Sequence, residues 1–221
     1  MKIAVSSAVF AALLRRGALT HLEWLEGCAS RLDVDGALFA LADFPRTDVE
    51  YAAQIKKVAT DLAIVPVALD VPGLLDPERP ASEGSEALAL ATAIGAALIA
   101  VTAGPPGELP PQTFARTVEA AKRLSSAAKA ANVTLAVAPA ADSLLADLSA
   151  VQTFCKYVDS AWLRYNLPVE RVSLDADLAP TSRRGWLVLE GDGGDDPFAR
   201  VSAAVERIRG QRPQMPSVVP G

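Results

Sequence analysis

The sequence predicts one eight-stranded α/β barrel, a (β/α)8 or TIM barrel, whose helices between the last strands are shortened or missing. Short apolar segments alternate with longer helical patterns, as in repeated βα units around a parallel sheet. The length of 221 residues suits a single barrel, and no linker divides the chain. An open doubly wound sheet is the alternative, disfavoured because no glycine-rich fingerprint follows the first strand. We expect residues 1–210 to form the barrel and residues 211–221, with three prolines, a flexible tail.

Eight apolar segments, most of them rich in Val, Ile, Leu and Ala, have the composition of buried parallel strands. They lie at 2–6, 36–41, 64–69, 97–102, 132–139, 161–166, 171–175 and 186–190. Only residues 167–170 separate the sixth strand from the seventh. A parallel crossover needs a dozen or more residues, so the helix between these two strands is expected to be missing or a single turn.

Amphipathic helical patterns fill most of the other gaps. We expect helices at 21–32, 48–62, 85–94, 111–131, from 142 or 143 to about 157, and from 197 to about 209, with a loop or short helix at 7–16 and a loop at 70–84. Residues suited to helix starts and stops are Thr20, Gly95, Asn132, Asp142 or Ser143, and Asp195 or Asp196.

The composition narrows the compartment and the partners. The chain is 51% hydrophobic with a net charge of -5, and it has no run of Lys or Arg. It therefore offers no electrostatic footprint for nucleic acid or an anionic membrane, and its apolar runs are too short to span a bilayer. Cys28 and Cys155 are too few for a disulfide framework and are expected to be buried thiols in a reducing cytoplasm.

Four segments, taken in order, resemble the xylose-isomerase-like barrels, which include sugar phosphate isomerases and epimerases. They are KIAVSS at the start, EALALATAIGAALIAVTAG through the fourth strand, ARTVEAAKRLSSAAKAANVTLAVAP through the fifth and LEGDGGDDPFARVSAAVERI at the end. The resemblance implies a divalent metal at the carboxyl ends of the strands. In the family this metal is held by a Glu after strand five, an Asp after strand six, a His on strand seven and a Glu on strand eight.

This chain departs from that ligand set at most positions. Ala138 stands where the resemblance expects the strand-five Glu, and Asn166 or Leu167 where it expects the Asp. The seventh strand has no His, and only Glu190 matches a ligand. A hard divalent cation needs several oxygen or nitrogen ligands, so neither a metal nor another cofactor is predicted.

Several polar residues near the predicted strand ends are weak candidates for a site, because barrel enzymes keep their sites at that face. Glu190, Asp175 and Asp177 could form an acidic pocket or an acid–base pair, with Asp70 and Asp192 at the same face; soluble rim carboxylates are the alternative. Candidate ligand-binding residues are Asn166, Arg183, Arg184 and Trp186, the last able to stack on a sugar or to pack in the core. His21, the one histidine, is interpreted as a capping or surface residue.

Three functions follow from these observations. The first is a catalytically degenerate member of the sugar phosphate isomerase/epimerase group that binds a small polar molecule or sugar, or is structural. The second is an active sugar isomerase or epimerase using carboxylates near Glu190. The third is a protein-interaction barrel, with a homodimer as one form, because a shortened helical wall would expose apolar surface.

Overall fold

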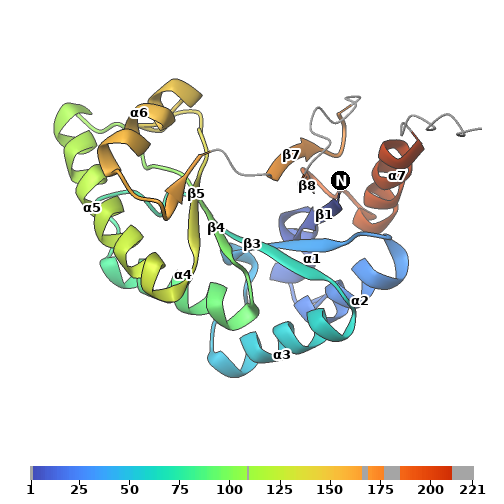
Figure 1. Ribbon diagram of the computed structural model, residues 1–221. Helices are drawn as coiled ribbons and strands as arrows, with labels where there is room; N and C mark the ends of the chain where they lie inside the picture. The colour runs from blue at the N-terminus through green and yellow to red at the C-terminus, as the bar shows by residue number, and fades with distance from the viewer. Residues whose placement is uncertain (1, 109, 166–168, 177–184, 211–221) are drawn as a thin grey trace, which may run out of the picture.

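The computed structural model describes residues 2–108, 110–165, 169–176 and 185–210, which form one curled parallel sheet with helices on its outer side (Figure 1). The strands are β1 (Lys2–Ser6), β2 (Gly36–Ala40), β3 (Val65–Val71), β4 (Leu98–Val101), β5 (Thr134–Val137), β6 (Leu163–Arg164), β7 (Val169–Ser173) and β8 (Trp186–Glu190). Their order is β6-β5-β4-β3-β2-β1-β8-β7. This is the strand order of a (β/α)8 barrel that is open between β6 and β7, so the predicted fold class is confirmed.

The opening follows from the length of one connection. Four residues, 165–168, join β6 to β7, and a parallel neighbour cannot be reached by so short a crossover. Twelve residues, 174–185, join β7 to β8, and these two strands pair in parallel from Val169–Trp186 to Ser173–Glu190. β7 begins and ends two residues before the strand that was predicted at 171–175. β6 has two residues, whereas a six-residue strand was predicted at 161–166.

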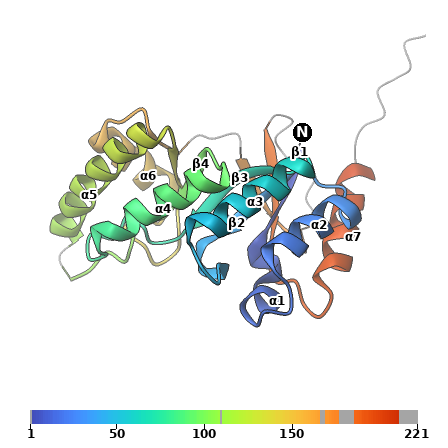
Figure 2. The same ribbon diagram turned by 90° about the horizontal axis from the view of Figure 1, so that it is seen from below.

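Helices cover the convex face of the sheet in the order α5, α4, α3, α2 and α7 (Figure 2). The helices are η1 (Ser7–Phe10), α1 (Ala11–Arg15), α2 (His21–Arg31), η2 (Leu41–Asp43), α3 (Val49–Asp61), α4 (Ala81–Ile94), α5 (Pro110–Ala131), α6 (Leu148–Val158) and α7 (Pro197–Gly210). In the described parts of these helices, none is long and apolar enough to cross a membrane.

The helix ends test the capping predictions. Thr20 and Glu23 form a reciprocal capping box at the start of α2, and Gly95 ends α4 with a φ of 84°. The prediction for α6 was wrong, because Asp147, not Asp142 or Ser143, accepts the capping hydrogen bond, from the Ala150 N–H. Several side chains in that segment can cap, and their residue types alone do not select one of them.

Two apolar layers lie on opposite faces of the sheet. The larger lies between strands and helices and contains alternate strand residues such as Leu69, Val71, Leu187 and Leu189. The smaller lies on the concave side of the sheet. It consists of Ala4, Leu38, Val67, Ala68 and Val188, with Leu98, Val169 and Trp186 packed against it. Residues that alternate with the outer layer therefore face the interior of the barrel.

Trp186 closes the amino-terminal end of that interior. Its ring lies over Gly36, where an added Cβ would come within 2.6 Å of the indole, and the Lys2 ammonium lies 5.3 Å from the ring centroid. The indole thus packs in the inner layer at the start of β8, four residues before the carboxyl end of the strand.

His21 is not the capping or surface residue that the sequence suggested. It is fully buried, stacks on Phe44 with ring centroids 4.4 Å apart, and places Nδ1 3.3 Å from the Tyr51 hydroxyl. Burial lowers the pKa of His21 to about 4, and the nearby charge of Asp43 opposes part of this shift. The first turn of α2 faces β2 and α3, and no local pattern in the sequence revealed this.

Candidate functional site

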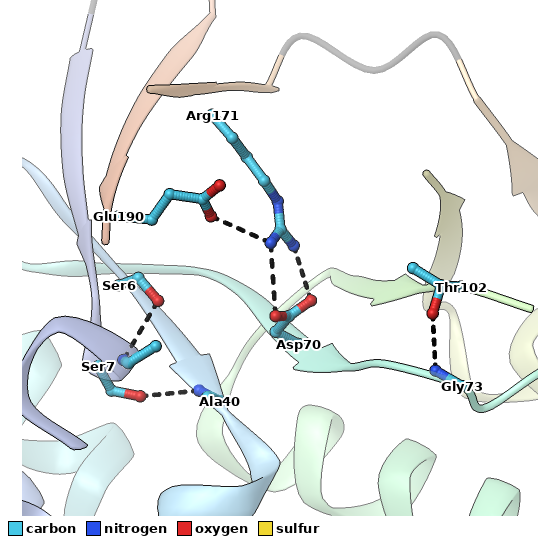
Figure 3. Close-up of polar contacts among 9 residues, drawn as sticks. Ser6, Ser7, Ala40, Asp70, Gly73, Thr102, Arg171 and Glu190 are labelled. Atoms are coloured by element: carbon cyan, nitrogen blue, oxygen red, sulfur yellow. Dashed lines mark hydrogen bonds and ion pairs between the residues drawn. The ribbon is translucent and has the colours of Figure 1, made fainter. Parts of the chain in front are cut away.

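Three charged side chains meet at the carboxyl ends of the strands, inside the curled sheet (Figure 3). Arg171 of β7 donates from Nη2 to Asp70 Oδ1 of β3 at 2.7 Å and from Nη1 to Asp70 Oδ2 at 3.4 Å. The same Nη1 lies 3.2 Å from Glu190 Oε2 of β8. We call these three residues the Arg171 triad. It links the last two strands at one end of the open sheet, β8 and β7, to β3 near the middle of the strand order.

Strand register explains why these side chains converge. Arg171 pairs with Val188, an inner-layer residue, and Glu190 follows Val188 by two positions, so both charged side chains face inward. Asp70 lies between Leu69 and Val71, which pack outward, and it pairs with Ala100 of β4. Asp70 was expected just after its strand, but β3 continues to Val71 and so holds this carboxylate inside the sheet.

The Arg171 triad is partly withdrawn from water. The side-chain exposures are 31% for Arg171, 22% for Asp70 and 36% for Glu190. Burial disfavours the charged guanidinium, but the hydrogen bonds and charges of Asp70 and Glu190 outweigh this effect and raise the pKa of Arg171. The guanidinium is therefore a permanent cation, and the triad carries one more negative than positive charge.

Beside the triad lies a cavity of about 220 Å³ on the concave side of the sheet. The cavity exists because Ala68, Ala100 and Ala136 face inward, at positions where many barrels have larger side chains that fill the interior. Its other lining residues are Leu38, Leu98, Val137, Ala138, Pro139, Tyr165, Val169 and Arg171. The cavity thus has an apolar floor and a charged side chain in its wall.

The rim around the triad is braced by hydrogen bonds between neighbouring strand ends (Figure 3). The buried Ser7 hydroxyl accepts from the Ala40 N–H at 2.8 Å and donates to Asp43 at 3.1 Å, while Arg15 pairs with Asp43 at 2.9 Å. On the other side of the mouth, Thr102 accepts from the Gly73 N–H at 2.8 Å. These bonds hold the loops after β1, β2 and β3 in place.

The described residues do not fit a divalent metal ion. Among them, no three His, Cys, Asp or Glu side chains gather closely enough to hold one. Ala138, at the position where the resemblance expects a glutamate ligand, lines the cavity with a methyl group. Glu190, the matching ligand, is occupied by the Arg171 guanidinium. A hard cation needs several oxygen ligands in one place, and this part of the chain does not supply them.

The candidate residues named from the sequence have separate positions. Glu190 belongs to the Arg171 triad, whereas Asp175 lies in the turn after β7 and pairs with Arg200 of α7. Trp186 lies at the opposite end of β8 from Glu190, in the inner apolar layer. Asn166, Asp177, Arg183 and Arg184 lie outside the described residues.

Arg171 is the residue that the sequence analysis missed. It appeared only as the first residue of a predicted strand, and its bidentate partner is 101 positions away. One signal was available: a strand of a barrel is covered on both faces, so a charge within it must find a partner. Arg171 lies two residues from Val169 and two from Ser173, the spacing that puts all three on one face.

Comparison with solved structures finds the same α/β barrel fold in several proteins of low sequence identity. A probable 3-DHS dehydratase from Bacillus anthracis aligns over 96% of this chain and 100% of its own, with a TM-score of 0.74 and 10% identity. A xylose isomerase domain containing protein from Salmonella typhimurium LT2 aligns over 95% and 96%, with a TM-score of 0.71 and 13% identity. D-psicose 3-epimerase from Clostridium cellulolyticum H10, solved with D-tagatose, aligns over 95% and 99%, with a TM-score of 0.68 and 13% identity.

These likenesses confirm the predicted resemblance at the level of fold. No protein-family model matches the chain, and no curated protein matches it by sequence. At identities of 10–13% the solved structures carry no residue roles over to this chain. The chemistry of the site has to be argued from its own side chains.

Proposed function

We propose that this chain binds a small, uncharged, polyhydroxylated molecule on the concave side of its sheet without a metal ion, as a catalytically degenerate relative of the sugar isomerases and epimerases. The observation that carries the proposal is the Arg171 triad beside the 220 Å³ cavity. Carboxylates accept hydrogen bonds from hydroxyl groups and a guanidinium donates them, while the apolar floor can pack against a sugar's carbon skeleton.

Charge argues against a phosphorylated ligand. Both terminal nitrogens of Arg171 are directed at Asp70 or Glu190, so the guanidinium is already matched by two carboxylates. A phosphate brought to the triad would meet a net negative charge in a partly buried place, where charges interact more strongly than in water. A neutral polyol avoids this repulsion.

Volume argues for a small ligand. Pockets for drug-sized molecules usually enclose roughly 300–1,000 Å³, and this cavity has about 220 Å³. The sheet is open between β6 and β7, and Tyr165, 42% exposed, lines the cavity. A similar fold solved with D-tagatose supports the choice of a free sugar as the first ligand to test.

The test is calorimetric titration of the purified chain with D-tagatose and other free monosaccharides, and with their phosphorylated counterparts. We expect binding of a free sugar that is unchanged by EDTA and weaker for the phosphorylated form. Ala136→Leu should abolish binding by filling the cavity, whereas Ala130→Leu, on the exposed face of α5, should not. Binding that needs a divalent ion, or that survives Ala136→Leu unchanged, would contradict the proposal.

The active-enzyme alternative is tested in the same samples. An isomerase or epimerase that moves a proton beside a carbonyl exchanges that hydrogen with solvent. NMR of a bound sugar in D2O should show no deuterium incorporation above a Glu190→Gln control if the barrel is degenerate. Incorporation that depends on Glu190 would establish an active isomerase or epimerase instead.

The interaction-barrel alternative rests on the outer face of β7, where Val172 is only partly buried. The connection from β6 to β7 is four residues long, too short for a crossover helix to cover this face. Light scattering after gel filtration distinguishes a monomer from a dimer. A dimer that persists on dilution would favour this alternative, and a monomer would count against it. The proposed partner remains a small molecule in the cytoplasm, with no nucleic acid and no membrane.

A further inference from the structure

The centre of the site holds a positive charge that belongs to the protein itself. We infer that Arg171 is the resident cation of this barrel, and that its guanidinium takes the place between Asp70 and Glu190 that a divalent ion would need. This guanidinium balances the two carboxylates whether or not a sugar is bound, so its role is separate from ligand binding. The resemblance implies a divalent metal, but the described donor set does not supply its ligands.

Geometry makes the two cations mutually exclusive. Arg171 engages both oxygens of Asp70, at 2.7 and 3.4 Å, and one oxygen of Glu190, at 3.2 Å. A divalent ion binds carboxylate oxygens at roughly 2.0–2.6 Å and would need the same lone pairs. Its charge would also meet the guanidinium within a few ångströms, and a guanidinium is not deprotonated in proteins.

The triad differs from an ordinary surface ion pair in three ways. Its members come from three strands, so each side chain is fixed by the sheet before the pair forms. Its fork contact to Asp70 is bidentate, the arrangement in which a guanidinium matches a carboxylate. Its members are two-thirds to three-quarters buried, so neither carboxylate is well solvated once the cation is removed.

The cation also bridges the interior of the curled sheet, from β7 to β3. β7 pairs with β8 but not with β6, so the bond from Arg171 to Asp70 of β3 reaches across the interior from one end strand. A divalent ion would balance charge in the same place. The guanidinium does this too, and because its side chain belongs to β7 it also links β7 to β3. Arg171 therefore positions β7 and shapes the cavity that it lines.

The test is chemical rescue followed by thermal unfolding, with no sugar present, so its result is independent of the proposed ligand. Arg171→Ala leaves two facing carboxylates, and its Tm should fall by about 4 °C, the size expected for a partly buried pair in a chain of this length. Low-millimolar methylguanidinium should restore part of that loss relative to equal sodium chloride. Arg164→Ala is the matched control, since this exposed arginine of β6 donates to the nearby Ala161 carbonyl and forms no ion pair with a described residue.

Three results would overturn the inference: a Tm of Arg171→Ala no lower than that of Arg164→Ala, equal effects of methylguanidinium on both variants, or stoichiometric Mn²⁺ on the wild-type protein by electron paramagnetic resonance. If Arg171→Ala does not fold, the double variant Asp70→Asn/Arg171→Ala decides. It removes one of the two unbalanced carboxylates and should fold, whereas a double variant no more stable than Arg171→Ala would contradict the inference.

Discussion

Lowering the pH should destabilise this protein through one residue, His21. The imidazole is fully buried among Trp24, Phe39, Phe44 and Tyr51, and its Nε2 finds no hydrogen-bond partner among the described residues. Burial holds the pKa of His21 at about 4 in the folded protein, and the charge of Asp43 opposes this only in part. In the unfolded chain the pKa returns to about 6.5.

The direction of the change in stability with pH depends on whether the folded or the unfolded state binds the proton more tightly. Between pH 6.5 and pH 4 the unfolded chain carries a charged His21 while the folded protein keeps it neutral, so acid stabilises the unfolded state. The stability is fully present above about pH 6.5 and is lost as the pH falls toward 4. The difference between the two pKa values corresponds to about 3 kcal/mol in total, of which about 2 kcal/mol is lost by about pH 5.

Urea unfolding from about pH 7.5 to about pH 5 measures this loss, and His21→Phe is the control because phenylalanine keeps an aromatic ring beside Phe44. The free energy of unfolding of the wild-type protein should fall by about 2 kcal/mol more than that of the variant over this range. Carboxylates titrate in both proteins and cancel in the difference. Parallel pH profiles would refute the claim that His21 is buried as a neutral ring.

Three further predictions concern packing, capping and thiol reactivity. Gly36→Ala should destabilise the protein by about 1–3 kcal/mol in urea unfolding, because the new methyl group meets the Trp186 ring; an unchanged midpoint would mean that the ring moves aside. Thr20→Ala should cost about 1 kcal/mol through loss of the capping box, and a neutral effect would show that the box contributes nothing. Burial raises the pKa of the Cys28 thiol and, less strongly, that of Cys155 to about 11, so maleimide should label native Cys155 slowly and Cys28 more slowly still; rapid labelling of Cys28 would contradict its burial.

Local signals were sufficient for most of the fold. β1 and β8 were predicted with their observed bounds, since each is a short apolar run between turn residues. α4 begins at Ala81, four residues before the predicted start, because the chain turns into the helix directly after Pro80. β6 could not be bounded from sequence, because its length depends on the short connection that follows it and on what pairs beside it.

The candidate site was predictable only in part. Asp70 and Glu190 were recognised at the strand ends because the carboxyl ends of parallel strands share one rim. Arg171 was not, because its role depends on a strand 101 residues away and on register within an open sheet. His21 was misjudged for a similar reason: its burial is produced by β2 and α3, which the residues around it do not encode.

A closed barrel has no strand edges, but this one has two, and the edges call for protection against pairing with other chains. β6 is only two residues long, which leaves little to pair with. β7 is longer, and it carries Glu170 and Arg171 side by side, one on each face. Charges on an edge strand discourage sheet-to-sheet addition because a second chain would have to bury them. Arg171 therefore disfavours aggregation through the β7 edge as well as neutralising the carboxylates of the site. An apolar residue at this position would make the protein more prone to aggregate at high concentration.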